Sequence, residues 1–97
     1  MIEVRQTSLY AEWFKDLRDR EAKARINVRI RRLSIGNPGD VKPVGSGVSE
    51  LRIDYGPGYR VYFVGRGDKL IILLAGGDKR TQRQDIQKAK ELAQSLD

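Results

Sequence analysis

Basic side chains gather at two places in the sequence where they could hold an anion. Arg52 and Arg60 flank the Gly-Pro-Gly turn of the stretch ELRIDYGPGYRVYFV, and Lys79, Arg80 and Arg83 follow the apolar run LIILLA. A guanidinium group binds phosphate through two parallel hydrogen bonds, and lysine supplies a point charge. If the fold brings the two groups together, they predict a binding site for a phosphate-bearing ligand.

The residue types that are absent narrow the chemistry. The 97 residues include no histidine and no cysteine. Histidine is the commonest metal ligand and the only side chain with an unperturbed pKa near neutrality, and cysteine is needed for disulfides and thiolate metal sites. The sequence therefore disfavours a zinc hydrolase or a Ser-His-Asp enzyme and predicts no metal. No small-molecule cofactor is expected, because the GSG tripeptide lacks the following helix that nucleotide-binding motifs require.

The overall charge agrees with an anionic partner. Lys and Arg number 19 against 13 Asp and Glu, a formal net charge of +6. Such a balance suits nucleic acid, an acidic protein or an anionic membrane, although many small proteins are basic without a specific partner. The first residues, MIEVRQT, contain no apolar leader, and LIILLA is far shorter than the roughly 20 residues that span a bilayer. The sequence predicts a cytoplasmic protein with no membrane contact.

Apolar residues at helical spacing predict two helices near the start of the chain. The first is expected to have Ser8 as its N-cap, and the second to begin near Asp19 and end at GNPGD. The apolar face of the first helix is expected to consist of Leu9, Trp13 and Leu17, widened by Tyr10 and Phe14. That of the second is expected to consist of Ala22, Ile26, Ile30 and Leu33. The many Lys and Arg residues between positions 15 and 32 fit a solvated outer face.

The remaining elements predict an α+β fold. A short strand is expected over residues 2–5, two strands flank the Gly-Pro-Gly turn, and a strand buried on both faces covers KLIILLAGG. VKPVGSGVS reads as a loop with room for a short edge strand. A last helix carries Ile86, Ala89, Ala93 and Leu96 on one face. The order β-α-α-β-β-β-α over residues 1–97 predicts one domain, a mostly antiparallel sheet with a helical hairpin on one face.

The hairpin determines which face its arginines occupy. With residues 56–58 as the loop, Asp54 lies opposite Arg60 and Arg52 lies opposite Tyr62. Strand alternation puts one set of side chains under the helices and the other on an open face, the latter being Glu50, Arg52, Asp54, Arg60, Tyr62 and Val64. Two interpretations remain: Arg60 pairs with Asp54 as a surface ion pair, or the arginines clamp a phosphate while Tyr62 stacks on a base.

The positively charged side chains before the last helix stand at an electrostatically unfavourable place. Lys79, Arg80 and Arg83 lie near a helix N-terminus, where the helix dipole disfavours positive charge. An anion attracted both by these side chains and by the free helix N–H groups would explain them. They are therefore candidates for the same ligand as Arg52 and Arg60.

Motifs along most of the chain resemble a known family. RINVRIRRLSIGNPGDVKPVGSGVSELRIDYGPGYRVYF and LLAGGDKRTQRQDIQKAKEL are similar to addiction-module killer proteins, HigB-like members of the RelE/ParE superfamily of toxins. The resemblance implies a RelE-like, microbial RNase-like fold. It also implies ribosome-dependent cleavage of messenger RNA and a helix-turn-helix antitoxin as partner. By position, the resemblance implies Arg60, Arg52 and either Lys79 or Arg80 as catalytic residues. Glu50, Tyr62 and Arg83 are expected in addition as RNA contacts.

The sequence departs from these relatives at two positions. Ile86 replaces a tyrosine found in the last helix of some of them, and a lysine pair of the first hairpin strand is reduced to Arg52. The arginines would stabilise charge at phosphorus, and Glu50, Lys79 and Tyr62 are the candidates for proton transfer. If the protein by itself is a weak nuclease, a ribosome that orients the messenger RNA would raise the rate of cleavage. Two alternatives remain: a ParE-like gyrase poison and a non-catalytic RNA- or protein-binding module.

Overall fold

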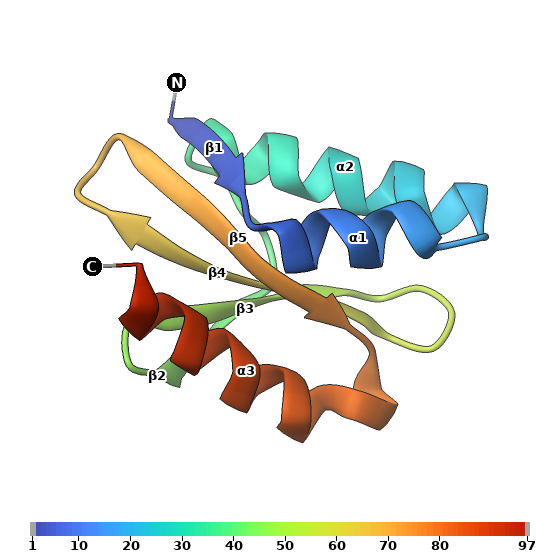
Figure 1. Cartoon of the computed structure of the whole chain (residues 1–97). Helices are drawn as coiled ribbons and strands as arrows, with labels where there is room; N and C mark the ends of the chain where they lie inside the picture. The colour runs from blue at the N-terminus through green and yellow to red at the C-terminus, as the bar shows by residue number, and fades with distance from the viewer. Residues whose placement is uncertain (1, 97) are drawn as a thin grey trace.

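The computed structural model describes residues 2–96 and contains one mixed sheet with three α-helices (Figure 1). The elements in chain order are β1 (Glu3–Gln6), α1 (Ser8–Asp16), α2 (Arg20–Ser34), β2 (Val41–Gly45), β3 (Val48–Ile53), β4 (Tyr59–Arg66), β5 (Leu70–Gly77), the 3-10 helix η1 (Lys79–Thr81) and α3 (Gln82–Ser95). The strands lie in the order β1-β5-β4-β3-β2, and only β1 pairs in parallel, with β5. The predicted α+β class is confirmed, with β2 as an added edge strand.

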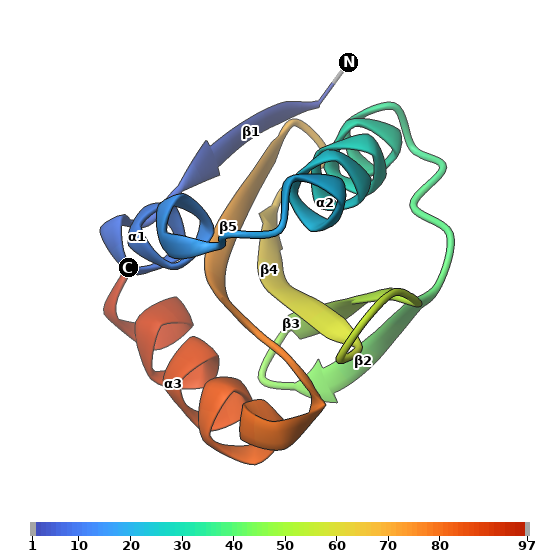
Figure 2. The same cartoon turned by 90° about the vertical axis from the view of Figure 1, so that its right-hand side faces the viewer.

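Helices cover both faces of the sheet (Figure 2). The predicted helical hairpin, α1 and α2, packs on one face, where Tyr10, Ile26 and Leu33 join the core. The expectation that the other face is open is wrong over most of its area, because α3 lies across it. Its small residues Ala89 and Ala93 let α3 approach the sheet closely, and both are buried. Among residues 2–96, no helix is long and apolar enough to cross a membrane.

The start of α1 differs by one residue from the prediction. Thr7 caps the helix, its hydroxyl accepting a hydrogen bond from the backbone N–H of Tyr10 at 3.1 Å. Tyr10 is therefore the residue of α1 that points into the core, and Leu9 is 42% exposed. The second helix begins close to the predicted start, with Asp19 as its cap, accepting from the N–H of Ala22 at 3.2 Å.

The hairpin between β3 and β4 has a longer loop than predicted. Residues 54–58 form the loop, so that Arg52 pairs with Arg60 and Glu50 with Tyr62. The predicted pairing of Asp54 with Arg60 is wrong by two residues, because turn hydrogen bonds from Tyr55 to Ile53 and from Gly58 to Tyr55 end both strands early. An even shift keeps every side chain on its predicted face.

Two glycines let helices approach the end of β5 from opposite sides. A Cβ atom on Gly76 would overlap the indole of Trp13 in α1, and one on Gly77 would overlap the carboxylate of Asp85 in α3. Gly77 is also the strand partner of Arg60. The close packing at this end of the sheet therefore positions both helices next to the arginines of the hairpin.

Candidate anion-binding site

Three of the predicted cations meet at one end of the sheet. Arg52 and Arg60 are direct partners on neighbouring strands, and Lys79 reaches them from η1. They line a pocket of about 210 Å³ together with Asp40, Ile53, Asp54, Gly56 and Gly58. The stem of Lys79 passes so close to Gly58 that a Cβ atom there would lie 2.9 Å from it. The structure thus brings Lys79 of the second predicted group to the two arginines of the first.

Arg60 is almost enclosed by the protein. Its side chain is 6% exposed, and its Nη1 donates to the carbonyl oxygens of Gly58 at 3.3 Å and Tyr59 at 3.2 Å. Its Nε is buried and makes no hydrogen bond, as is also true of the Nε of Arg52. A buried charged donor without an acceptor is costly. Both Nε atoms are inaccessible to solvent, so an anionic ligand in the pocket would be bound by the other guanidinium N–H groups and by Lys79.

Glu50 is a buried carboxylate behind the two arginines. It is 1% exposed, and its Oε1 lies 3.8 Å from the Nε of Arg52 and 3.8 Å from the Nε of Arg60. Its Oε2 accepts hydrogen bonds from the hydroxyl of Tyr62 at 3.0 Å and from the side chain of Gln82 at 2.7 Å. The expectation that Glu50 contacts RNA is wrong for this arrangement. The carboxylate instead joins the first turn of α3 to the sheet and offsets part of the arginine charge.

Tyr62 is also enclosed rather than open. It is fully buried, and its pKa is raised far above the usual range by burial, by the charge of Glu50 and by their hydrogen bond. The phenol therefore stays protonated and donates to Glu50. Its predicted roles in stacking on a base and in proton transfer do not fit this position. The apolar face of the last helix was the sequence signal that this side of the hairpin needed a cover.

The net charge of the pocket is lower than three cations suggest. Asp40 and Asp54 lie on its wall, and the Oδ2 of Asp40 is 3.9 Å from the Nε of Arg52. Both aspartates are exposed, so solvent and ions screen them. The local field is therefore set by a few specific donors rather than by a large excess of positive charge.

Arg29 was not predicted as a site residue, yet it holds the pocket wall in place. Its guanidinium donates to the carbonyls of Pro38 at 3.1 and 2.9 Å, Asp40 at 3.0 Å and Arg52 at 2.6 Å. Burial lowers its pKa, with a further contribution from nearby Arg32. The sequence offered no signal for this role, because Arg29 stands among other arginines on a helix that reads as solvated.

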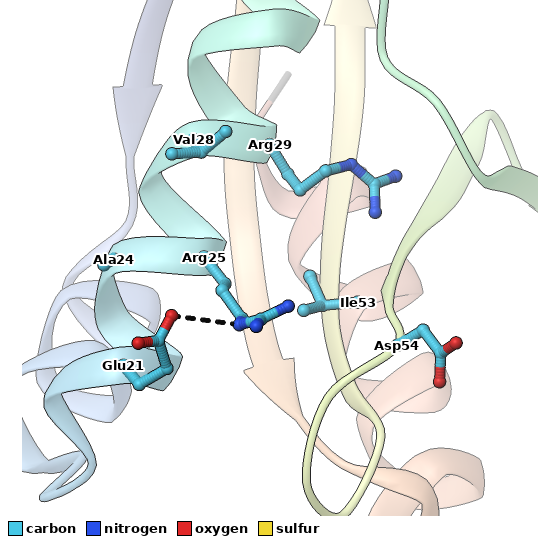
Figure 3. A pocket seen from close by; sticks show the side chains of 7 residues that line it. All are labelled: Glu21, Ala24, Arg25, Val28, Arg29, Ile53 and Asp54. Atoms are coloured by element: carbon cyan, nitrogen blue, oxygen red, sulfur yellow. Dashed lines mark hydrogen bonds and ion pairs between the residues drawn. The ribbon is translucent and has the colours of Figure 1, made fainter.

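A second, larger pocket shares Ile53 and Asp54 with the arginine pocket (Figure 3). It has a volume of about 360 Å³ and is lined by Glu21, Ala24, Arg25, Val28, Arg29, Ile53 and Asp54. Arg25 is engaged within the protein, 3.1 Å from Glu21 and stacked over the ring of Tyr55 at 4.6 Å. Val28 is 57% exposed on its wall. This pocket is a partly apolar groove between α2 and the hairpin loop.

The remaining predicted cations do not join the arginine pocket. Arg80 is exposed, and its Nη2 lies 2.9 Å from the Oδ2 of Asp78, whose pKa is lowered by the hydrogen bond from Arg80. Arg83 is exposed in the first turn of α3 and does not line the pocket. Asp78 therefore accounts for one of the cations near the helix N-terminus without any ligand.

Comparison with known proteins places the chain in a family. Residues 12–95 match the family described as phage-derived protein Gp49-like (DUF891), and this stretch contains every cation of the pocket. The chain belongs to the Gp49-like family. This Gp49-like chain is also 52% identical over 95 residues to an uncharacterized protein of Haemophilus influenzae, a match that covers 98% of this chain and 96% of that protein.

Proposed function

We propose that this Gp49-like protein is the toxin of a bacterial type II toxin–antitoxin system, a metal-independent endoribonuclease that cleaves messenger RNA on the ribosome in the cytoplasm. The observation that carries the proposal is the convergence of Arg52, Arg60 and Lys79 on one pocket. The resemblance to HigB-like and RelE-like toxins supports the same function. Membership of the Gp49-like family agrees with it.

The pocket residues suit cleavage through the 2′-hydroxyl of the substrate. The 2′-oxygen loses its proton and attacks the adjacent phosphorus, the bond to the 5′-oxygen breaks, and that oxygen takes up a proton. The products are a 2′,3′-cyclic phosphate and a free 5′-hydroxyl. The negative charge that develops on the phosphoryl oxygens is stabilised by Arg52, Arg60 and Lys79, and such stabilisation is commonly the largest catalytic contribution.

Proton transfer is the weaker part of the catalytic apparatus. Glu50 and Tyr62 are enclosed behind the arginines, so the groups at the pocket surface are Lys79 and the two aspartates, Asp40 and Asp54. Arginine stays protonated and cannot serve as the base. A ribosome that holds the 2′-oxygen in line with the scissile bond would supply the missing rate through orientation.

Primer-extension mapping of message ends tests the proposed function. Purified protein added to ribosomes with a bound message should give discrete cuts with cyclic phosphate ends, and the same message without ribosomes should be cut far more slowly. Equal cleavage with and without ribosomes would contradict the ribosome-dependent mechanism. DNA breaks without message cleavage would instead identify a gyrase poison, and RNA binding without cleavage would identify a non-catalytic module.

We propose the groove of Figure 3 as the docking surface for the antitoxin. Helix α2 carries six Lys and Arg residues against a single acid, Glu21, so an acidic partner would relieve the repulsion among them. The exposed Val28 offers an apolar anchor between these charges. The partner expected here is an acidic segment of a helix-turn-helix antitoxin.

Substitution of the anchor tests this docking surface. Val28→Asp should weaken antitoxin binding by at least tenfold, because it places an acid in the groove, while message cleavage by the free toxin stays unchanged. Titration calorimetry with the product of the neighbouring gene measures the affinity. Gln94→Asp, an exposed change on α3, is the matched control. Unchanged binding by Val28→Asp would place the antitoxin elsewhere.

A further inference from the structure

An aromatic pair lies at the same end of the sheet as the arginine pocket. Trp13 from α1 and Tyr59 from β4 are both partly exposed, and their ring centroids are 6.4 Å apart in an edge-to-face arrangement. Gly76 leaves the room that the indole occupies against β5, and Gly56 lies beside the ring of Tyr59. Packing on glycines holds both rings in place while part of each stays in contact with solvent.

Basic side chains connect this aromatic pair to the pocket. Tyr59 directly precedes Arg60, so their side chains emerge on opposite faces of the same strand end. Lys79 lines the arginine pocket, and its neighbour Arg80 lies outside that pocket. Arg80 is 81% exposed and is oriented by Asp78. An exposed cation is therefore available next to the pocket.

We propose that Tyr59 and Trp13 form a nucleobase subsite, in which the base next to the scissile phosphate lies on the two rings and its own phosphate contacts Arg80. This inference rests on the proposed function, since it assigns part of the single-stranded RNA to a surface outside the pocket. Base stacking on aromatic rings beside a cation is a recurrent way of holding single strands, and it tolerates any base. A strand that crosses the end of the sheet would contact the subsite and the arginine pocket together.

Tyr59, rather than the predicted Tyr62, is the tyrosine of this strand that we assign to a base. Tyr62 is on the same strand but is covered by α3, whereas Tyr59 is partly exposed at the strand's beginning. Tyr55, the other aromatic of the hairpin loop, has its ring covered by the guanidinium of Arg25. The hydroxyl of Tyr55 is also bonded to Asp19, so Tyr59 and Trp13, which contact each other, are the aromatic pair that we assign to the base.

The intrinsic fluorescence of Trp13 gives a direct test, because it is the only tryptophan in the chain. A short 2′-O-methyl oligonucleotide, which cannot be cleaved through its 2′-oxygen, is titrated into the protein and compared with the same backbone carrying abasic positions. The base-bearing probe should quench Trp13, and the abasic probe should not. Equal quenching by both probes, or quenching by an acidic peptide alone, would overturn the subsite and, in the latter case, indicate a protein partner.

Substitutions of the tyrosine supply the second measurement. Tyr59→Ala should weaken binding of the base-bearing probe about tenfold, within the range for loss of one stacked base, while Tyr59→Phe keeps most of the affinity. Tyr55→Ala is the control, because Tyr55 lies outside the Trp13–Tyr59 pair and is engaged by Arg25 and Asp19. Unchanged affinity in Tyr59→Ala would overturn the inference, and the wild-type abasic comparison remains decisive if that variant does not fold.

Failure of the subsite is distinguishable from failure of the proposed function. Message cleavage on ribosomes without any base-dependent quenching would leave the endoribonuclease intact and remove the subsite. Base-dependent quenching without cleavage would keep the subsite as an RNA-binding surface and remove the catalytic proposal.

Discussion

The two faces of the sheet are closed in different ways. On the α1/α2 face, aliphatic and aromatic residues such as Ile26, Leu51 and Phe63 fill the space, and the hydroxyl of Tyr10 is buried without a partner. On the α3 face, an apolar cluster around Val64 and Leu74 covers only part of the sheet. The rest of this face is occupied by a buried polar group, in which Glu50 contacts Arg60, Tyr62 and Gln82.

The α1/α2 face contributes mainly to stability, whereas the polar part of the α3 face positions charged side chains. Apolar packing contributes roughly 25 cal/mol per Å² buried, whereas a buried ion cluster often contributes less than apolar residues of the same volume. The polar half of the α3 face is therefore the costlier way to close a sheet. This polar group lies directly behind the pocket lined by Arg52 and Lys79, where oriented charge would serve the proposed cleavage.

The largest effect expected from this comparison is on activity. Arg60→Ala removes an oriented cation from the pocket and should lower ribosome-dependent cleavage by roughly 100- to 1000-fold, the range for loss of one donor that stabilises developing charge. Single-turnover cleavage of a ribosome-bound message measures the rate. Arg5→Ala removes the same charge at the far edge of the sheet and should leave the rate unchanged, because Arg5 pairs only with exposed Glu3. Equal rates in both variants would show that the polar group on the α3 face does not contribute to catalysis.

The largest effect expected on stability comes from Glu50. Glu50→Ala leaves Arg60 buried without its counterion and removes the acceptor of Tyr62 and Gln82, so the free energy of unfolding should fall by about 3–5 kcal/mol. Denaturant unfolding measures the loss. Glu12→Ala, on the exposed side of α1, should change it by less than about 0.5 kcal/mol. A similar small change in both variants would show that the polar cluster does not hold α3 to the sheet.

The packing on the α1 side is tested at Gly76. Gly76→Ala places a methyl group where the Trp13 indole lies, and overpacking of this kind should cost about 1–3 kcal/mol. Thermal unfolding and the emission wavelength of Trp13 both report the change. The control is Gly65→Ala on β4, where the nearest atom to an added Cβ is 3.9 Å away. A neutral result at Gly76 would mean that α1 can shift without loss.

The two buried tyrosines give the smallest and most direct contrast between the faces. Tyr62→Phe removes a hydrogen bond to a buried carboxylate and should cost about 1.5 kcal/mol. Tyr10→Phe removes a hydroxyl that has no partner and should be neutral or slightly stabilising. Equal losses in the two variants, measured by urea unfolding, would contradict the assignment of the polar group to one face only.

The same tyrosines predict an alkaline limit of stability. Burial raises the pKa of both above the ordinary value of 10.0, and the charge of Glu50 adds to the shift at Tyr62. Their protonated forms are favoured in the folded state, so this stability is complete below pH 10 and falls as the pH rises above it. Each tyrosine should contribute a slope of about 1.4 kcal/mol per pH unit there. The double phenylalanine variant should flatten the decline, and an unchanged slope would contradict the burial effect.

The sequence by itself determined the periodic features of this protein. Helical spacing located α1 and α2, and strand alternation assigned Arg52 and Arg60 to one face, an assignment that survived the two-residue shift in hairpin register. Such patterns depend on neighbouring residues along the chain, where backbone geometry alone decides which side chains share a face. The convergence of Lys79 on the same pocket also followed the predicted order of elements.

Only the tertiary structure decided which of these side chains meet solvent. Alternation divides a strand into two faces but does not say which helix covers each, so the burial of Glu50 and Tyr62 under α3 could not be read from their strands. That Lys79 lines the pocket while Arg80 does not depends on how η1 leaves β5. These outcomes arise from contacts between segments distant in sequence, and no local spacing encodes them.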